Sequence, residues 1–245
     1  MKEQIGPLTR AFVDGLRRIL GDKLHGCYIY GAAAFPDNMP TGDIDFHVIL
    51  EEPPTDDEKS ALSGLHKALG RDYPPLGKEM DGYYLLLADA RGSKPPQSQM
   101  WNNATDTSWA LHRAHLRAGR FLALHGPDPK DIYAAPTWPE IEHALEGELT
   151  YVEDHLGQYP PYCILQLCRL IYSHQTREVV VSKAQTSRWA RDEFPEWKRL
   201  IELAGSAYAG EASQEDNDVM RSEVSAFLQF ARAKIARAAG DRRGT

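Results

Sequence analysis

The stretch YGAAAFPDNMPTGDIDF, residues 30–46, decides the fold of the N-terminal half of the chain. It starts at the end of a short apolar run, residues 27–30, turns at a glycine, and passes through a loop into a second run, residues 43–50. In that second run polar and apolar residues alternate, which is the pattern of a strand with one buried face. The apolar face carries Ile44, Phe46, Val48 and Leu50, and the other face carries Asp43, Asp45 and His47. The sequence therefore predicts two strands joined by a glycine turn and a loop.

The two aspartates of this stretch lie two residues apart in the predicted strand. Asp43 and Asp45 would leave the same face, with about 6.7 Å between them along the strand. Two such charges repel each other by roughly 2.5 kcal/mol at an effective dielectric constant near 20. Carboxylate oxygens shared with substrate phosphates suit Mg²⁺. The spacing is compatible with a magnesium site, although an Asp-x-Asp pair on an exposed strand, taken alone, is more often solvated than catalytic.

The residues around this stretch alternate between helical and extended patterns, and those beyond it are almost entirely helical. A helix is expected over residues 7–20, a capped helix from Thr55 through Leu69, and a further strand over residues 80–88. The next helix is expected to run from the region of Trp109 through Leu122 to a stop at Gly126. The later helices are predicted over residues 139–156, 162–175, 183–194, 196–208 and 215–239.

This order of elements predicts an α+β fold with two domains. Strands that come early and helices that come late indicate a mixed β-sheet with helices, followed by an all-α helical-bundle domain. The pair Pro160-Pro161 interrupts the helical pattern, and proline both breaks helices and stiffens connections. We therefore expect domains over residues 1–157 and 158–245.

Composition excludes several classes of protein. The chain of 245 residues has 28 basic and 35 acidic side chains, and this net charge of −7 gives no general attraction to nucleic acid or to an anionic membrane. Its three cysteines lack a CxxC spacing, so neither a disulfide framework nor a zinc site is expected. No signal peptide and no apolar run of about 20 residues is present. We expect a cytoplasmic monomer with buried thiols and without nucleic-acid or membrane partners.

The order Gly31-Ala32, then Asp43-Ile44-Asp45, resembles the Gly-Ser…Asp-x-Asp signature of the polymerase-beta-like nucleotidyltransferases. Within that superfamily the chain is most similar to the aminoglycoside 3''-adenylyltransferases, which are streptomycin and spectinomycin resistance enzymes. The similarity extends into the second half, where short segments look like the helical C-terminal domain of that family: residues 162–173, 182–183, 189–190, 194–195 and 200–204. The resemblance thus covers most of the chain, and it implies a nucleotidyltransferase-type catalytic domain followed by a helical domain.

The resemblance also implies roles for three carboxylates. Asp43 and Asp45 would hold Mg²⁺, and a third carboxylate from a later strand would act as catalytic base or metal neighbour. Asp81 matches that third position best, and Glu79 is the alternative because it shares the face of Asp81. The base would take the proton of the acceptor hydroxyl as its oxygen attacks the α-phosphorus of ATP.

The nucleotide side of the implied site has contributions from both halves. The backbone N–H groups of Gly31 and Ala32 would approach the leaving pyrophosphate at the start of a helix. The family has serine after the glycine, so Ala32 leaves the phosphates without one hydroxyl contact. Ser182 and Lys183 would meet the phosphates from the helical domain, although a solvated helix start explains these two residues equally well.

The acceptor side is where the chain departs from its relatives. Trp109, Ala184 and Arg188 are the candidates for this side, and the resistance enzymes carry acidic residues near positions 184 and 188. A neutral and a positive residue there disfavour a polycationic drug, so we expect streptomycin to be a poor acceptor. The predicted function is Mg²⁺-dependent transfer of AMP from ATP to a hydroxyl of a small, aminoglycoside-like molecule. The alternatives are a nucleotide-binding homologue with weak or no activity, and an enzyme that modifies a protein hydroxyl.

Overall fold

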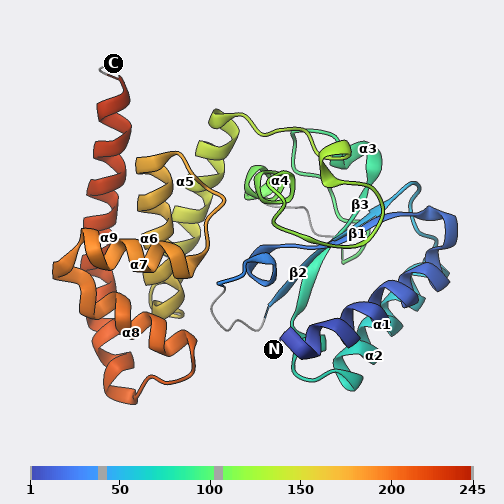
Figure 1. Ribbon diagram of the computed structural model, residues 1–245, viewed down its shortest axis with the longest axis horizontal. Helices are drawn as coiled ribbons and strands as arrows, with labels where there is room; N and C mark the ends of the chain where they lie inside the picture. The colour runs from blue at the N-terminus through green and yellow to red at the C-terminus, as the bar shows by residue number, and fades with distance from the viewer. Residues whose placement is uncertain (1, 38–42, 102–106, 244–245) are drawn as a thin grey trace. The chain divides into compact units, whose positions relative to one another are not determined.

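The computed structural model describes residues 2–37, 43–101 and 107–243. Contacts divide the chain into two compact units. The first unit comprises Met1–Pro36 and Thr41–Ile141, and the second comprises Asp37–Pro40 and Glu142–Thr245. Figure 1 shows the sheet with its helices in the first unit and a purely helical second unit.

The first unit is built on a four-stranded mixed sheet. Its strands have the order β3-β2-β1-β4, in which β2 and β3 run parallel and β1 is antiparallel to both β2 and β4. The bounds of the strands are β1 Leu24–Ile29, β2 Ile44–Leu50, β3 Met80–Leu86 and β4 Leu122–His125. The helices of this unit are α1 Lys2–Leu20, α2 Asp56–Asp72, α3 Leu87–Ala90 and α4 Trp109–Arg117. The α+β architecture expected from the sequence is thereby confirmed.

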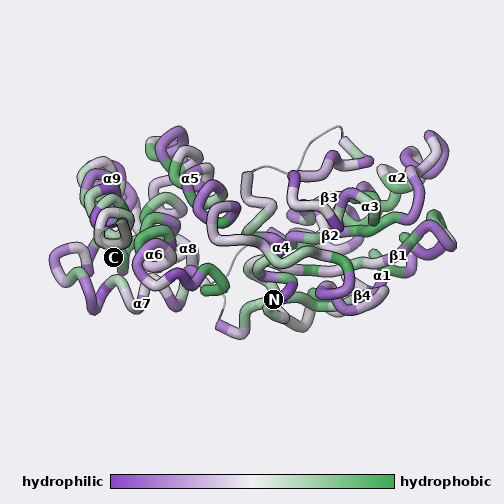
Figure 2. The backbone as a smooth tube through the Cα atoms, turned by 90° about the horizontal axis from the view of Figure 1, so that it is seen from above, coloured by the Kyte–Doolittle hydropathy of each residue, from purple (hydrophilic) through white to green (hydrophobic). Residues whose placement is uncertain are grey.

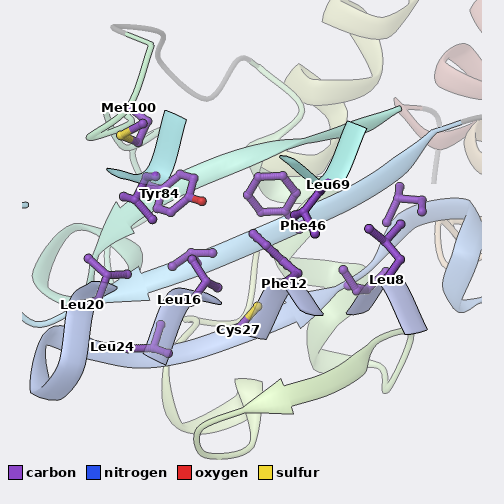
Figure 3. Close-up of a cluster of buried hydrophobic side chains, with 14 of the residues drawn as sticks. Leu8, Phe12, Leu16, Leu20, Leu24, Cys27, Phe46, Leu69, Tyr84 and Met100 are labelled. Atoms are coloured by element: carbon purple, nitrogen blue, oxygen red, sulfur yellow. The ribbon is translucent and has the colours of Figure 1, made fainter. Parts of the chain in front are cut away.

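Helices cover both faces of this sheet. On one face α1 and α2 bury an apolar cluster in which Phe12 of α1 meets Phe46 of β2 edge to face, with ring centroids 5.0 Å apart. Figure 3 shows Leu8, Phe12 and Leu16 of α1 beneath β2. The opposite face packs on Trp109 and Leu116 of α4. The apolar residues of β2 lie in the cluster under α1 and α2, and Asp45 near the start of the strand is its one half-buried residue.

Helix α2 begins with the predicted capping box. The Thr55 hydroxyl accepts from the backbone N–H of Glu58 at 3.2 Å, and the Glu58 carboxylate accepts from the Thr55 N–H. The same carboxylate forms an ion pair of 2.8 Å with Lys23.

The prediction that the helix at Trp109 continues to Gly126 is wrong. Helix α4 ends at Arg117, because Gly119 adopts a left-handed conformation with φ of +80°. The N–H of Gly119 donates to Leu116 and that of Arg120 donates to His115, which together form a Schellman motif. The chain then enters β4, the edge strand that pairs with β1.

The second unit consists of helices packed around α6. The bounds are α5 Trp138–His155, α6 Pro160–Thr176, α7 Lys183–Glu193, α8 Lys198–Tyr208 and α9 Gln214–Arg243. Eleven residues of α6 are buried, and Figure 2 colours much of this helix as hydrophobic. A helix that is apolar nearly all round belongs in the centre of a bundle, and α7, α8 and α9 all pack against it.

The unit boundary differs from the predicted boundary at residues 157/158. Pro160 and Pro161 open α6, where proline is tolerated because the first N–H groups of a helix have no partner within it. Helix α5 contacts this bundle: the amide of Gln166 in α6 donates to the Glu148 carboxylate at 2.6 Å. Arg232 in α9 likewise donates to Glu153 at 2.8 Å. These contacts explain why residues from Glu142 onward group with the helical unit.

The three thiols are free and buried, as the sequence predicts. Burial raises the pKa of Cys163 to about 11, and it raises the pKa of Cys27 and Cys168 further. A thiol that stays protonated is a poor nucleophile and a poor metal ligand. Within the described part of the chain, none of the helices has the length and apolar character that a membrane crossing requires.

The turn after α4 leads to a stability prediction. Gly119 has a positive φ and open space around its α-carbon, whereas Gly64 lies inside α2 with equally open space. Gly119→Ala should destabilise the protein by about 1–2 kcal/mol, because L side chains disfavour the left-handed region. Gly64→Ala should stabilise it by about 0.5–1 kcal/mol, because alanine is the better helix former. Urea unfolding midpoints that shift in the same direction for both variants would contradict this turn geometry.

Candidate active site

The predicted carboxylates of the first unit lie together at the start of the parallel strand pair. Asp45 of β2 is the register partner of Asp81 of β3, and neighbouring strands are about 4.8 Å apart. Asp43 and Glu79 immediately precede these strands, where the N–H of Ile44 donates to the carbonyl of Glu79 at 2.8 Å. Asp45 is half-buried, while Asp43, Glu79 and Asp81 are exposed. The parallel register places Asp81, rather than Glu79, directly beside Asp45.

Gly31 lies against the carboxylate of Asp45. Its φ is +65°, and a β-carbon added to it would overlap the Asp45 side chain. The neighbouring N–H of Tyr30 donates to the backbone carbonyl of Asp45 at 2.9 Å. Residues Gly31–Ala34 form a single 3-10 turn, where the sequence led us to expect the start of a longer helix. The 3-10 turn and Asp45 are therefore so close together that position 31 has no room for a side chain.

The carboxylates offer the donor chemistry that Mg²⁺ prefers, but they do not form a closed cage. Among the residues that the structure describes, no group of three Asp, Glu, His or Cys side chains is gathered closely enough to hold a metal ion. Mg²⁺ in nucleotide-dependent enzymes is bound by one or two carboxylates together with substrate phosphates and water. The acidic strand start, with Asp43 and Asp45 beside Asp81, fits an ion that arrives with its nucleotide.

A buried aromatic and histidine cluster forms the floor beside these carboxylates. His47, two residues after Asp45, shares a hydrogen bond of 3.0 Å between its Nδ1 and the Tyr133 hydroxyl and stacks on Trp109 with ring centroids 5.6 Å apart. Burial, followed by the charge of His112, holds the pKa of His47 well below its ordinary value. The imidazole is therefore neutral. Trp109 is only 1% exposed and belongs to this buried cluster, and its place on the acceptor side stays a prediction.

Two predicted nucleotide-binding residues begin α7 in the second unit. The Ser182 hydroxyl caps the helix by accepting from the N–H of Gln185 at 3.0 Å. The ammonium group of Lys183 lies 3.9 Å from the centroid of the Tyr162 ring and donates to the Tyr208 hydroxyl at 3.3 Å. Both side chains thus have partners within the helical unit, and Ser182 is buried rather than solvated; their contact with nucleotide phosphates stays a prediction.

Arg188 on α7 has a partner that the sequence did not reveal. Its guanidinium donates to the carboxylate of Asp37 at 2.6 Å. Partial burial raises the pKa of Asp37, but hydrogen bonds from Arg188 and Ser182 outweigh it and leave this pKa below its usual value. The positive charge that we expected Arg188 to present to an acceptor is therefore balanced by Asp37. Ala184, one turn earlier, contributes neither a charge nor a hydrogen-bonding side chain.

Comparisons with known proteins agree with this architecture. Residues 139–234 match the family described as aminoglycoside adenylyltransferase, C-terminal domain. The curated spectinomycin 9-adenylyltransferase of Enterococcus faecalis is 22% identical, over 83% of this chain and 87% of that protein. A crystal structure of an Enterococcus spectinomycin adenyltransferase with ATP and spectinomycin aligns with a TM-score of 0.73 and 18% identity, and it covers 95% of this chain and 99% of that one.

Fold and sequence therefore point to the same class. The first unit has the mixed sheet and the carboxylates that the sequence resemblance implies, and the fold of the chain is shared with the spectinomycin adenyltransferase structure. More particularly, residues 139–234 are similar to the C-terminal domain of the aminoglycoside adenylyltransferases. The resemblance inferred from the sequence is confirmed, and the comparisons support an enzyme of the adenylyltransferase class.

The contact between Gly31 and Asp45 can be tested by a matched pair of substitutions. Gly31 and Gly21 both have positive φ, of 65° and 53°, but only Gly31 has a side chain in the way of an added methyl group. Gly21→Ala should cost about 1–2 kcal/mol of stability and leave activity intact. Gly31→Ala should cost more stability and also displace Asp45, so that ATP-dependent activity is lost. Equal stability and equal activity for the two variants would show that Asp45 does not lie against this turn.

Proposed function

We propose that this chain transfers AMP from ATP to a hydroxyl group of an aminocyclitol antibiotic such as spectinomycin. The observation that carries the proposal is the placement of Asp45 beside Asp81 and against the Gly31 turn. The proposal is supported by a fold shared with a spectinomycin adenyltransferase that was crystallised with ATP and spectinomycin.

In the proposed reaction the acceptor oxygen forms a bond to the α-phosphorus of ATP. The bond from that phosphorus to the oxygen bridging to the β-phosphate breaks, and pyrophosphate leaves with the bonding electron pair. Asp81, exposed beside Asp45, takes the proton of the attacking hydroxyl as general base. Asp43 and Asp45 are the residues that would hold Mg²⁺, which neutralises phosphate charge when it is bound. Most of the catalysis of such transfers comes from positioning and electrostatic stabilisation.

The nucleotide contacts are assigned to two places in the chain. The small residues Gly31 and Ala32 allow the backbone of the 3-10 turn to approach the phosphates. In the second unit, Lys183 and Ser182 at the start of α7 are the candidates for nucleotide contacts: Lys183 carries a positive charge held on Tyr162, and Ser182 caps the helix.

The charges on α7 affect which antibiotic we expect to be the better acceptor. Arg188 is balanced by Asp37, and Ala184 is neutral, so the described part of α7 presents no unpaired carboxylate at these positions to a polycationic drug. Streptomycin carries strongly basic guanidinium groups that need such carboxylates, whereas spectinomycin carries only two secondary amines. We therefore expect a higher kcat/KM for spectinomycin than for streptomycin. A kcat/KM for streptomycin equal to or above that for spectinomycin would contradict this assignment.

The role of the strand-start carboxylates can be tested by removing one charge at a time. Asp43→Asn and Asp45→Asn should each lower the rate of spectinomycin-dependent pyrophosphate release by about a hundredfold or more. The fold should survive, because each variant relieves repulsion between neighbouring carboxylates. Asp22→Asn, an exposed change in the same unit, is the matched control and should keep full activity. Full activity of either site variant would defeat the assignment, and a wild-type chain that binds ATP without releasing pyrophosphate would favour the binding-only alternative.

A further inference from the structure

The proposed site is strongly acidic where a polyanion has to bind. Asp43, Asp45, Glu79 and Asp81 gather at the start of β2 and β3, and the triphosphate of ATP adds further negative charge. Ala32, in the turn beside Asp45, has no hydroxyl to offer to a phosphate. A cationic side chain of the first unit near the turn would offset this negative charge. None of the residues of the first unit assigned to the reaction so far is cationic.

Arg120 lies beside that turn. The turn ends at Ala34. The guanidinium carbon of Arg120 lies over the ring of the next residue, Phe35, at 5.3 Å from the ring centroid. The pairing of β1 with β4 points to the same place: Ile29 is the partner of Leu122, and continuing this antiparallel register brings the backbone of residue 120 level with Gly31. Both observations concern the first unit alone.

The backbone of Arg120 is fixed before any ligand binds. Its N–H donates to the carbonyl of His115 at 3.0 Å and completes the Schellman motif that ends α4. The ring of His115 in turn packs edge to face on Phe35, with centroids 5.5 Å apart. The guanidinium therefore projects from a rigid helix end onto a buried aromatic ring, which reduces the entropy lost on binding.

The guanidinium of Arg120 has unused hydrogen-bonding capacity. Its Nε is buried and has no hydrogen-bond partner among the described residues, and no ion pair of this side chain occurs in that part of the chain. A buried donor without a hydrogen-bond partner lowers the stability of the protein. The Arg120 side chain as a whole is half-buried, so part of it is exposed. A guanidinium presents a planar fork of donors that matches two oxygens of a phosphate.

We propose that Arg120 is a phosphate-binding residue of the adenylyl-transfer site, which contacts the β- and γ-phosphates of ATP beside the Gly31–Ala34 turn. During transfer the bond between the α-phosphorus and the bridging oxygen breaks, and the departing pyrophosphate gains negative charge that the guanidinium stabilises. This inference rests on the proposed function, because it takes ATP as the ligand.

The test compares nucleotides that differ only in these phosphates. ATP and AMP binding to the full chain at constant Mg²⁺ is measured by calorimetry for wild type, Arg120→Gln and Arg120→Lys. Loss of a charge-assisted contact should weaken ATP binding by about ten- to a hundredfold in R120Q and leave AMP binding unchanged. R120K, which keeps the charge but loses the fork, should show a smaller loss. Arg18→Gln, which removes an exposed charge of the same unit, is the control and should bind both nucleotides normally.

The possible outcomes separate this inference from the function on which it rests. Equal ATP affinity in wild type and R120Q, or an equal loss for ATP and AMP, would overturn the role of Arg120 while leaving the transferase proposal intact. A wild-type chain that binds no ATP would overturn both. If R120Q is unfolded at the assay temperature, the ATP affinity of R120K is the test. An ATP affinity of folded R120K equal to that of wild type would then overturn the inference.

Discussion

The backbone of Gly31 touches the carboxylate of Asp45, and this contact depends on two features of the sequence at once. A residue with a side chain at position 31 would both enter the left-handed region and collide with the aspartate. Strand β2 must also begin in the one register that aims Asp45 at the turn, because a shift by one residue would send it to the opposite face. In the same register Asp45 is paired with Asp81 of the parallel strand. The turn, the acidic strand start and the third carboxylate therefore follow from a single packing arrangement.

Charge balance is the second constraint on the molecule. The strand start concentrates carboxylates, and binding of a nucleotide there requires positive charge from a metal ion, from the first unit or from the second. Arg120 meets this need within the first unit under our proposal, because the Schellman motif and Phe35 hold it beside the turn. In the second unit, Asp37 balances Arg188. The position occupied by acidic residues in the resistance enzymes is thus a closed ion pair in this chain.

Much of this organisation could be predicted from the sequence because it depends on local patterns. Alternating residues identified β2 and its two faces, and the Thr55–Glu58 capping box identified the start of α2. Interactions between distant segments could not be predicted in this way. The pairing of Asp37 with Arg188 joins residues that are far apart in the chain, and neither residue carries a local signal for the other.

The wrong prediction of a helix beyond Arg117 has a physical cause. Leu122 was assigned to a helix that was expected to continue to Gly126, but Gly119 ends the helix first and β4 pairs with β1. Trp109 was proposed to stack on a ligand ring, and the stacking on His47 inside the core is a contact that the sequence did not reveal. Gly119, which has a positive φ, was the available sequence signal for the helix end.

The most direct measurement follows radioactive label from ATP into spectinomycin. The wild-type chain would be incubated with spectinomycin and Mg²⁺, in parallel, with ATP labelled at the α-phosphate and with ATP labelled at the γ-phosphate. Adenylyl transfer predicts that the drug acquires the α label and that the γ label appears only in pyrophosphate. Transfer of the γ label to the drug, or release of pyrophosphate without labelled drug, would contradict the reaction derived from the Asp45–Asp81 arrangement.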